Sequence, residues 1–130
     1  MNIEHFNKLK AALRAEVLID KNRRKIRFNM NTFYDSRVGC GTSACLAGWC
    51  YIMDKGEKRL DDISHEKIAE YLEIPNNDAY DMAYGIGSRV RFLSDLSIKD
   101  AINMLEIYER EGTVRWSKAM DMTRTKILVT

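Results

Sequence analysis

The sequence predicts an all-α fold, a compact single-domain bundle of about five helices around one buried central helix. Apolar residues recur at three- and four-residue steps in several segments, which is the spacing of one helix face. Residues 40–53, CGTSACLAGWCYIM, carry no charged side chain although 31% of the chain is charged, and a helix without a polar face is usually buried on all sides. A length of 130 residues supports one core, so we expect residues 1–130 to form a single helical domain.

The first helix is expected at about residues 2–19, with its apolar side chains on one face. These apolar side chains are Ile3, Phe6, Leu9, Leu13 and Val17. A basic run follows the helix, and it consists of Lys21, Arg23, Arg24, Lys25 and Arg27. Two interpretations of this run stay open: a solvated turn whose long side chains extend into water, or a patch that contacts phosphate groups.

A minor two-stranded ribbon is a further option. Residues 26–30 alternate apolar and polar side chains, which is strand periodicity, and the only other β-like run is the tail at residues 126–129. These two runs could pair, although an isolated pair of strands is only marginally stable.

The central helix is expected to begin at about Ser43 and to end near Lys55. The Thr42 hydroxyl can accept a hydrogen bond from an amide of the first turn, and Gly41 before it permits a sharp chain entry. At the other end, Gly56 supplies a C-cap. The first turn lacks an acidic residue that would offset the positive end of the helix dipole, so its free amides are a candidate anion site.

Two short helices are expected next. The first covers about residues 64–74 and is stopped by Pro75. The second is capped by Asn76 or Asn77 and ends at Gly85, which opens a permissive glycine-containing turn.

The last predicted helix has the clearest amphipathic face in the chain. It begins with Ser97 and Asp100, which have the spacing of a capping box, and it ends at Gly112. Residues 117–130 are expected to form a C-terminal tail of uncertain order.

Composition and charge favour a folded protein of the cytoplasm. The apolar fraction is 45%, and no run approaches the roughly eighteen apolar residues of a membrane-spanning helix. The first residues lack the apolar core of a signal peptide, so we expect a soluble intracellular protein without a membrane partner. The net charge of +2 does not favour a general grip on nucleic acid, although residues 1–59 carry an excess of positive charge and residues 60–130 an excess of negative charge.

Three cysteines spaced five residues apart, Cys40, Cys45 and Cys50, are the first candidates for chemistry. Cys45 and Cys50 would lie about 140° apart around a helix and diverge, and the only histidines are His5 and His65, so no metal site is expected. The simplest interpretation is that these cysteines are reduced and pack as small apolar residues. The alternative is a thiol-dependent enzyme, with Cys45 or Cys40 as nucleophile and His65 as base.

Ligand capture without covalent chemistry is the third interpretation. The candidate ligand-binding residues are Gly41, Thr42 and Ser43 at the expected helix start, and Arg89 and Arg91 after the glycine-containing turn. Together with the basic run and nearby aromatic residues, they supply what an anionic, base-bearing ligand needs. The chain has no P-loop, dinucleotide fingerprint, nucleophile elbow or HExxH motif, and no cofactor is expected.

Three segments in order resemble a group of small, uncharacterised bacterial and bacteriophage proteins that share a Cys-Gly-Thr-x-Ala-Cys-x-Ala-Gly signature. The segments are RFNM at residues 27–30, CGTSACLAGW at residues 40–49, and an amphipathic helix closed by GTVRW at residues 112–116. The chain departs from the pattern at Cys50, where a small residue such as alanine is expected. The resemblance implies a phage or mobile-element setting and transfers no catalytic residue.

The resulting hypothesis is a non-enzymatic, phage-type binding protein that interferes with a host or defence pathway in the host cytoplasm. Its favoured target is an anionic nucleotide-derived ligand or a nucleic acid. Two alternatives stay open: a protein-protein inhibitor of a host protein, and the thiol-dependent enzyme.

Overall fold

The computed structural model describes residues 1–17, 26–28, 30, 42–55 and 64–129. Within these ranges the α-helices are α1 (Ile3–Val17), α2 (Leu46–Lys55), α3 (Glu66–Leu72), α4 (Asn76–Ala83), α5 (Ile98–Glu111) and α6 (Trp116–Val129). A 3-10 turn, η2 (Leu93–Asp95), and two short strands, β1 (Ile26–Phe28) and β2 (Thr42–Ala44), complete the described elements. The predicted all-α helical bundle is confirmed.

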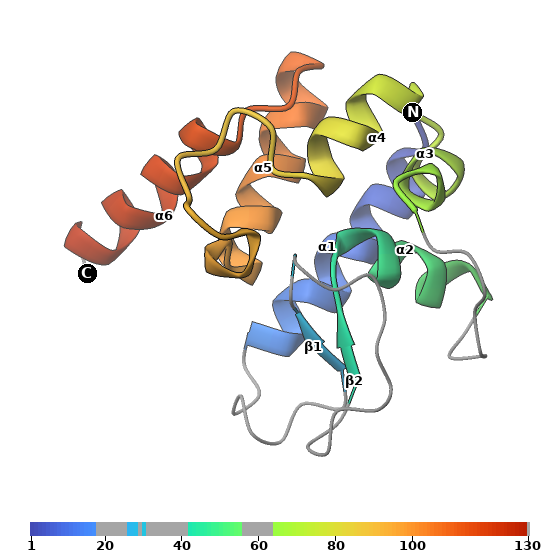
Figure 1. Cartoon of the computed structure of the whole chain (residues 1–130), viewed down its shortest axis with the longest axis horizontal. Coiled ribbons are helices and arrows are strands. Elements are labelled where there is room, and N and C mark those ends of the chain that lie inside the picture. The colour runs from blue at the N-terminus through green and yellow to red at the C-terminus, as the bar shows by residue number, and fades with distance from the viewer. Residues whose placement is uncertain (18–25, 29, 31–41, 56–63, 130) are drawn as a thin grey trace.

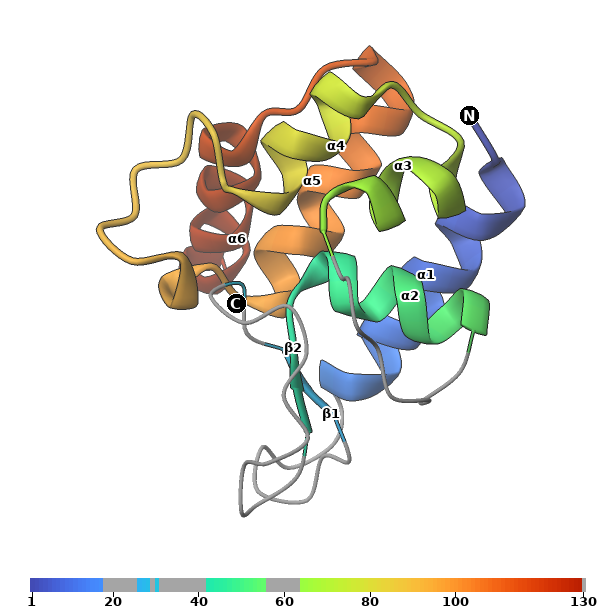
Figure 2. The same cartoon turned by 45° about the vertical axis from the view of Figure 1, so that its right-hand side comes forward.

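Helix α5 lies in the middle of the bundle, between α1 and α6 (Figures 1 and 2). The shorter helices cover another side, where α3 packs on α2 and on α4. Helix α1 also contacts α2 and α3, so it joins the two groups. Segments far apart in the sequence therefore share one apolar interior.

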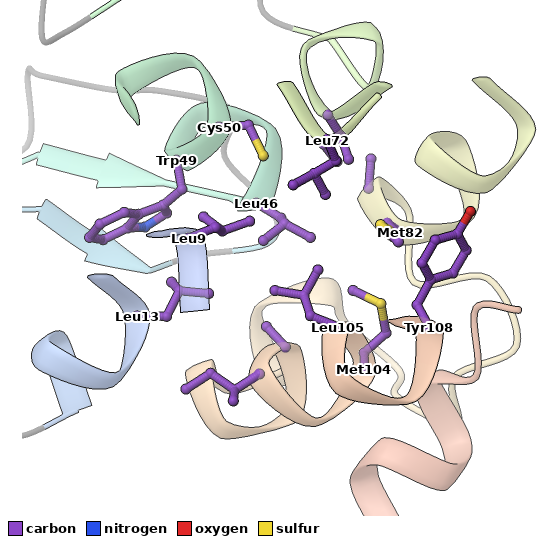
Figure 3. Close-up of a cluster of buried hydrophobic side chains, with 14 of the residues drawn as sticks. Leu9, Leu13, Leu46, Trp49, Cys50, Leu72, Met82, Met104, Leu105 and Tyr108 are labelled. Atoms are coloured by element: carbon purple, nitrogen blue, oxygen red, sulfur yellow. The ribbon is translucent and has the colours of Figure 1, made fainter. Parts of the chain in front are cut away.

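The interior is formed by apolar side chains from all six described helices, and Figure 3 shows a part of it in which the side chains point toward one another. The labelled members are Leu9, Leu13, Leu46, Trp49, Cys50, Leu72, Met82, Met104, Leu105 and Tyr108. Cys50 is fully buried among them, as expected for a cysteine that packs as a small apolar residue.

The predicted ends of α5 are confirmed. The Ser97 hydroxyl accepts a hydrogen bond from the Asp100 amide at 3.1 Å, and the Asp100 carboxylate accepts one from the Ser97 amide at 3.0 Å. At the other end, Gly112 has a left-handed φ of 72° and its N–H donates to the Tyr108 carbonyl. Both caps satisfy backbone groups that the helix itself leaves unpaired.

The predicted start of the central helix is wrong. Thr42 and Ser43 belong to β2, which pairs in parallel with β1, and α2 begins only at Leu46. The first helical hydrogen bond runs from the Trp49 amide to the Cys45 carbonyl at 2.9 Å, so Cys45 rather than Thr42 precedes the helix. The backbone N–H and C=O groups of Thr42 and Ser43 are engaged in pairing with β1, so they do not form the first turn of the helix.

The predicted ribbon has a different partner, and the predicted tail is helical. Strand β1 pairs with β2, with Ile26 opposite Thr42, and not with residues 126–129. Those residues belong to the last turn of α6. The apolar tail continues a helix because α6 packs along α5, a long-range contact that local strand-like composition does not reveal.

The two short helices differ from the prediction at their ends. Helix α3 ends at Leu72, where Glu73 adopts a left-handed φ of 54° ahead of Pro75. Pro75 is itself the residue before α4, so Asn76 and Asn77 lie inside the helix and neither caps it. Proline lacks an amide hydrogen and has a fixed φ, which suits this boundary position.

Candidate binding loop

The expected anion site depended on a helix that begins at about Ser43, whereas α2 begins at Leu46. Gly41 lies outside the described residues, and the backbone of Thr42 and Ser43 is paired in β2. The true first turn of α2 is sealed, because Cys45, Leu46 and the following residues to Cys50 are all buried. The Ala47 and Gly48 amides interact with the Cys45 sulfur inside this buried turn, so they are not presented to an anion in solvent.

Cys45 does not have the environment of a nucleophile. The side chain is 1% exposed, and burial raises the pKa of its thiol, an effect that the nearby Gly48 and Ala47 amides only partly offset. Burial likewise raises the pKa of Cys50 well above its usual value. A reactive cysteine needs the opposite shift and access to a substrate.

His65, the proposed base, lies in an aromatic cluster. Its ring meets Tyr80 edge-on at a centroid distance of 5.3 Å and Tyr84 at 6.1 Å. Its Nδ1 atom is buried without a hydrogen-bond partner among the described residues. Cys40 lies outside the described ranges, so its pairing with His65 stays a prediction.

We predict that Cys45 and Cys50 resist alkylation in the native protein. Iodoacetamide at pH 8 should leave both thiols unmodified, because both are buried and the pKa of each is raised. Peptide mass mapping before and after denaturation in guanidinium measures the effect, with the denatured chain as the control for intrinsic reactivity. Rapid labelling of Cys45 in the native protein would contradict this prediction and support the thiol-dependent enzyme.

Arg89 and Arg91 lie on the segment that joins α4 to η2, residues 84–92, which we call the 84–92 loop. The loop passes beside α6 at the edge of the molecule (Figures 1 and 2). Arg89 forms an exposed ion pair with Asp121 on α6. Arg91 is exposed, and its guanidinium carbon lies 5.4 Å from the centroid of the Phe92 ring. The two arginines therefore share a loop but have different partners.

Hydrogen bonds brace the base of the 84–92 loop. The Ile86 amide donates to the Asp81 carbonyl at 3.2 Å, which closes the end of α4. The same carbonyl accepts from the Trp116 indole N–H at 3.0 Å, and the Ser117 hydroxyl donates to the Gly87 carbonyl at 2.6 Å. The start of α6 thus fixes the first half of the loop.

Replacing each of two glycines in this loop by alanine should destabilise the protein, and the loss should be larger at Gly85 than at Gly87. Gly85 has φ +62°, and a Cβ there would lie 2.8 Å from a Leu93 methyl group, whereas Gly87 has φ +83° and open space around it. We expect Gly85→Ala to lower the free energy of unfolding by about 2–3 kcal/mol and the matched Gly87→Ala by about 1 kcal/mol. Urea denaturation measures both. Equal losses would contradict the close packing of Gly85.

The loop exposes one large apolar side chain near each of its ends. Phe92 is 60% exposed and Ile86 is 47% exposed. The sequence pattern points to the two arginines and not to these apolar residues. The available signal was an isoleucine between two glycines and a phenylalanine beside an arginine, in a segment without helical periodicity. Both side chains are therefore accessible to solvent and available for contact with a partner.

The other predicted site residues do not join this loop within the described structure. Lys21, Arg23, Arg24 and Lys25 lie outside the described ranges, and Arg27 lies in β1. Among the residues with described positions, no three His, Cys, Asp or Glu side chains gather as metal ligands.

Every helix in the described ranges is too short or too polar to cross a membrane.

Comparison of the chain with protein-family models, curated proteins and solved structures finds no match.

Proposed function

We propose that this protein is a non-enzymatic binding protein that captures an anion-bearing partner with the 84–92 loop. One observation carries the proposal: Phe92 is 60% exposed, with the Arg91 guanidinium over its ring, on a loop whose base is fixed by α6. Arg91 has no ion pair within the part of the chain that the structure describes, and an exposed aromatic ring beside an arginine is a frequent energetic centre of binding surfaces.

The loop is suited to binding because little order has to be created when a partner arrives. Its base is fixed by the Ser117 and Trp116 hydrogen bonds, so the backbone there has already lost its conformational freedom. Stacking on Phe92 restricts Arg91 while leaving the edge of its guanidinium group able to donate hydrogen bonds to a carboxylate or phosphate.

The setting of the partner follows from the resemblance in the sequence. A phage or mobile-element protein that binds without catalysis would act on a host or defence pathway in the host cytoplasm. A nucleotide-derived ligand, a nucleic acid and a host protein all carry anionic groups that Arg91 could bind.

Replacing either loop residue should weaken capture of the partner. We expect Phe92→Ala and Arg91→Ala each to reduce the partner retained from a bacterial lysate by about tenfold or more, which corresponds to about 1.4 kcal/mol of binding free energy. Immobilised full-length chain, quantified by mass spectrometry and nucleic-acid staining, measures the effect. Because both side chains are exposed, the melting temperature should not change.

Two matched variants serve as controls for this experiment. Ile3 on α1 is 48% exposed and lies far in sequence from the loop, and Arg110 is an exposed arginine at the end of α5. Ile3→Ala and Arg110→Ala should retain the partner as the unaltered chain does. If all four variants retain it equally, the loop is not the binding site and the proposal fails.

A further inference from the structure

We infer that the partner of the 84–92 loop is a short protein segment in which a carboxylate stands beside an apolar side chain. This inference rests on the proposed function and makes it more specific. Three properties of the loop lead to it: the balance of charge, the kind of apolar residue exposed, and the size of the surface.

The charge around the loop suits a single carboxylate better than a polyanion. Asp121 already neutralises Arg89, and Asp95 adds an exposed negative charge in η2 directly after the loop. Arg91 makes no ion pair with any described residue. Nucleic-acid binding draws on many cations that together displace counterions, whereas one guanidinium group pairs in bidentate fashion with one carboxylate.

The exposed apolar residues suit amino-acid side chains better than bases. A single-stranded nucleic acid stacks its bases on aromatic rings, and Phe92 could serve it. Ile86, however, is a branched aliphatic side chain that is 47% exposed on the same loop and offers no flat surface for stacking. An exposed aromatic ring beside an arginine, with an exposed aliphatic side chain on the same loop, is typical of protein interfaces, where aromatic residues and arginine are enriched.

The size of the surface points to a short segment. The candidate contacts lie on the few residues from Ile86 to Phe92, and a stable interface between two globular proteins buries about 800 Å² on each partner. One loop presents much less than a globular interface. A peptide or an exposed segment of a larger protein matches this small surface, with an acidic group for Arg91 and an apolar group for the Phe92 ring beside it.

Selection from a displayed library of random short peptides, on immobilised full-length chain, tests the inference. We expect the enriched peptides to place Asp or Glu next to an aromatic or aliphatic residue. Synthetic copies should bind the Arg91→Ala and Phe92→Ala chains about tenfold more weakly, and the Arg110→Ala chain unchanged. Charge reversal gives the sharper result, because Arg91→Glu should select peptides with Lys or Arg in place of the acidic residue, whereas Arg110→Glu should not.

Single-stranded oligo(dT) and oligo(rU) are tested on the same chains. Binding of an oligonucleotide that Arg91→Ala abolishes would overturn the peptide inference while supporting the loop as the binding site. The inference also falls if no peptide is enriched, or if enriched peptides lack acidic residues. If the loop variants change neither peptide binding nor capture from a lysate, both the inference and the proposed function fail.

Discussion

Replacing Trp116 by alanine will lower the free energy of unfolding by about 4–5 kcal/mol. The side chain is fully buried at the start of α6, so its removal leaves a large cavity where α6 meets the rest of the bundle. Its indole N–H also donates to the Asp81 carbonyl at the end of α4, and alanine would leave that carbonyl without this donor. Urea denaturation followed by circular dichroism measures the loss.

A phenylalanine at the same position separates the two contributions. Trp116→Phe retains most of the apolar volume but removes the N–H donor, so we expect a smaller loss of about 1–3 kcal/mol. Because the Asp81 carbonyl also accepts the Ile86 amide, both variants should loosen the 84–92 loop, which hydrogen exchange at Ile86 would detect. Equal stability of the alanine variant and the unaltered chain would contradict the packing of α6 described above.

Replacing Lys10 by alanine will cost about 3–4 kcal/mol of stability, because it leaves a largely buried carboxylate without its counter-ion. Lys10 on α1 is buried, and its ammonium group lies 3.0 Å from a carboxylate oxygen of Glu109 on α5. The other oxygen of that carboxylate is buried and has no hydrogen-bond partner among the described residues. The ammonium group is therefore what compensates the Glu109 charge.

A double variant tests this explanation. Lys10→Met with Glu109→Leu removes both charges and keeps apolar volume, so its stability should lie within about 1 kcal/mol of the unaltered chain. Lys8→Ala breaks the exposed pair between Lys8 and Glu4 and should change stability little, because solvent screens that pair. A double variant as unstable as Lys10→Ala would show that the cost comes from packing of the lysine stem and not from the unpaired carboxylate.

The proposed binding surface and the fold depend on the same helix contacts. Trp116 and Ser117 begin α6 and at the same time brace the 84–92 loop. The loop can present Phe92 and Arg91 to a partner because its base is not free to collapse onto the core. Stability and binding should therefore be separable only at the exposed side chains of Arg91 and Phe92, and not at the braced base of the loop.

Local sequence features predicted α5 well. Its cap residues act within one turn of the chain, so Ser97, Asp100 and Gly112 could be recognised without knowledge of the fold. The start of α2 was placed too early because β2 pairs with a strand fourteen or more residues away in the chain. The residues next to Thr42 in the sequence favour a helix cap, but its pairing with Ile26 in the folded chain makes it part of a strand.

The ligand-binding role of Arg89 and Arg91 stays a prediction. Arg89 and Arg91 were selected because they follow a glycine-containing turn, and the structure places both on the 84–92 loop. The exposure of Phe92 and Ile86 was not predictable, since an apolar residue in a sequence is more often buried and only the packed structure shows which ones find no place in the core.

The sequence by itself determined the helical class, the buried character of residues 45–50 and the two ends of α5. These follow from side-chain periodicity and from hydrogen bonds between near neighbours in the chain. Only the tertiary structure decided where α2 begins, that the C-terminal residues are helical, and that one loop displays an arginine on an exposed aromatic ring. Those outcomes depend on contacts between distant segments, whose free energy is not encoded in any single stretch of residues.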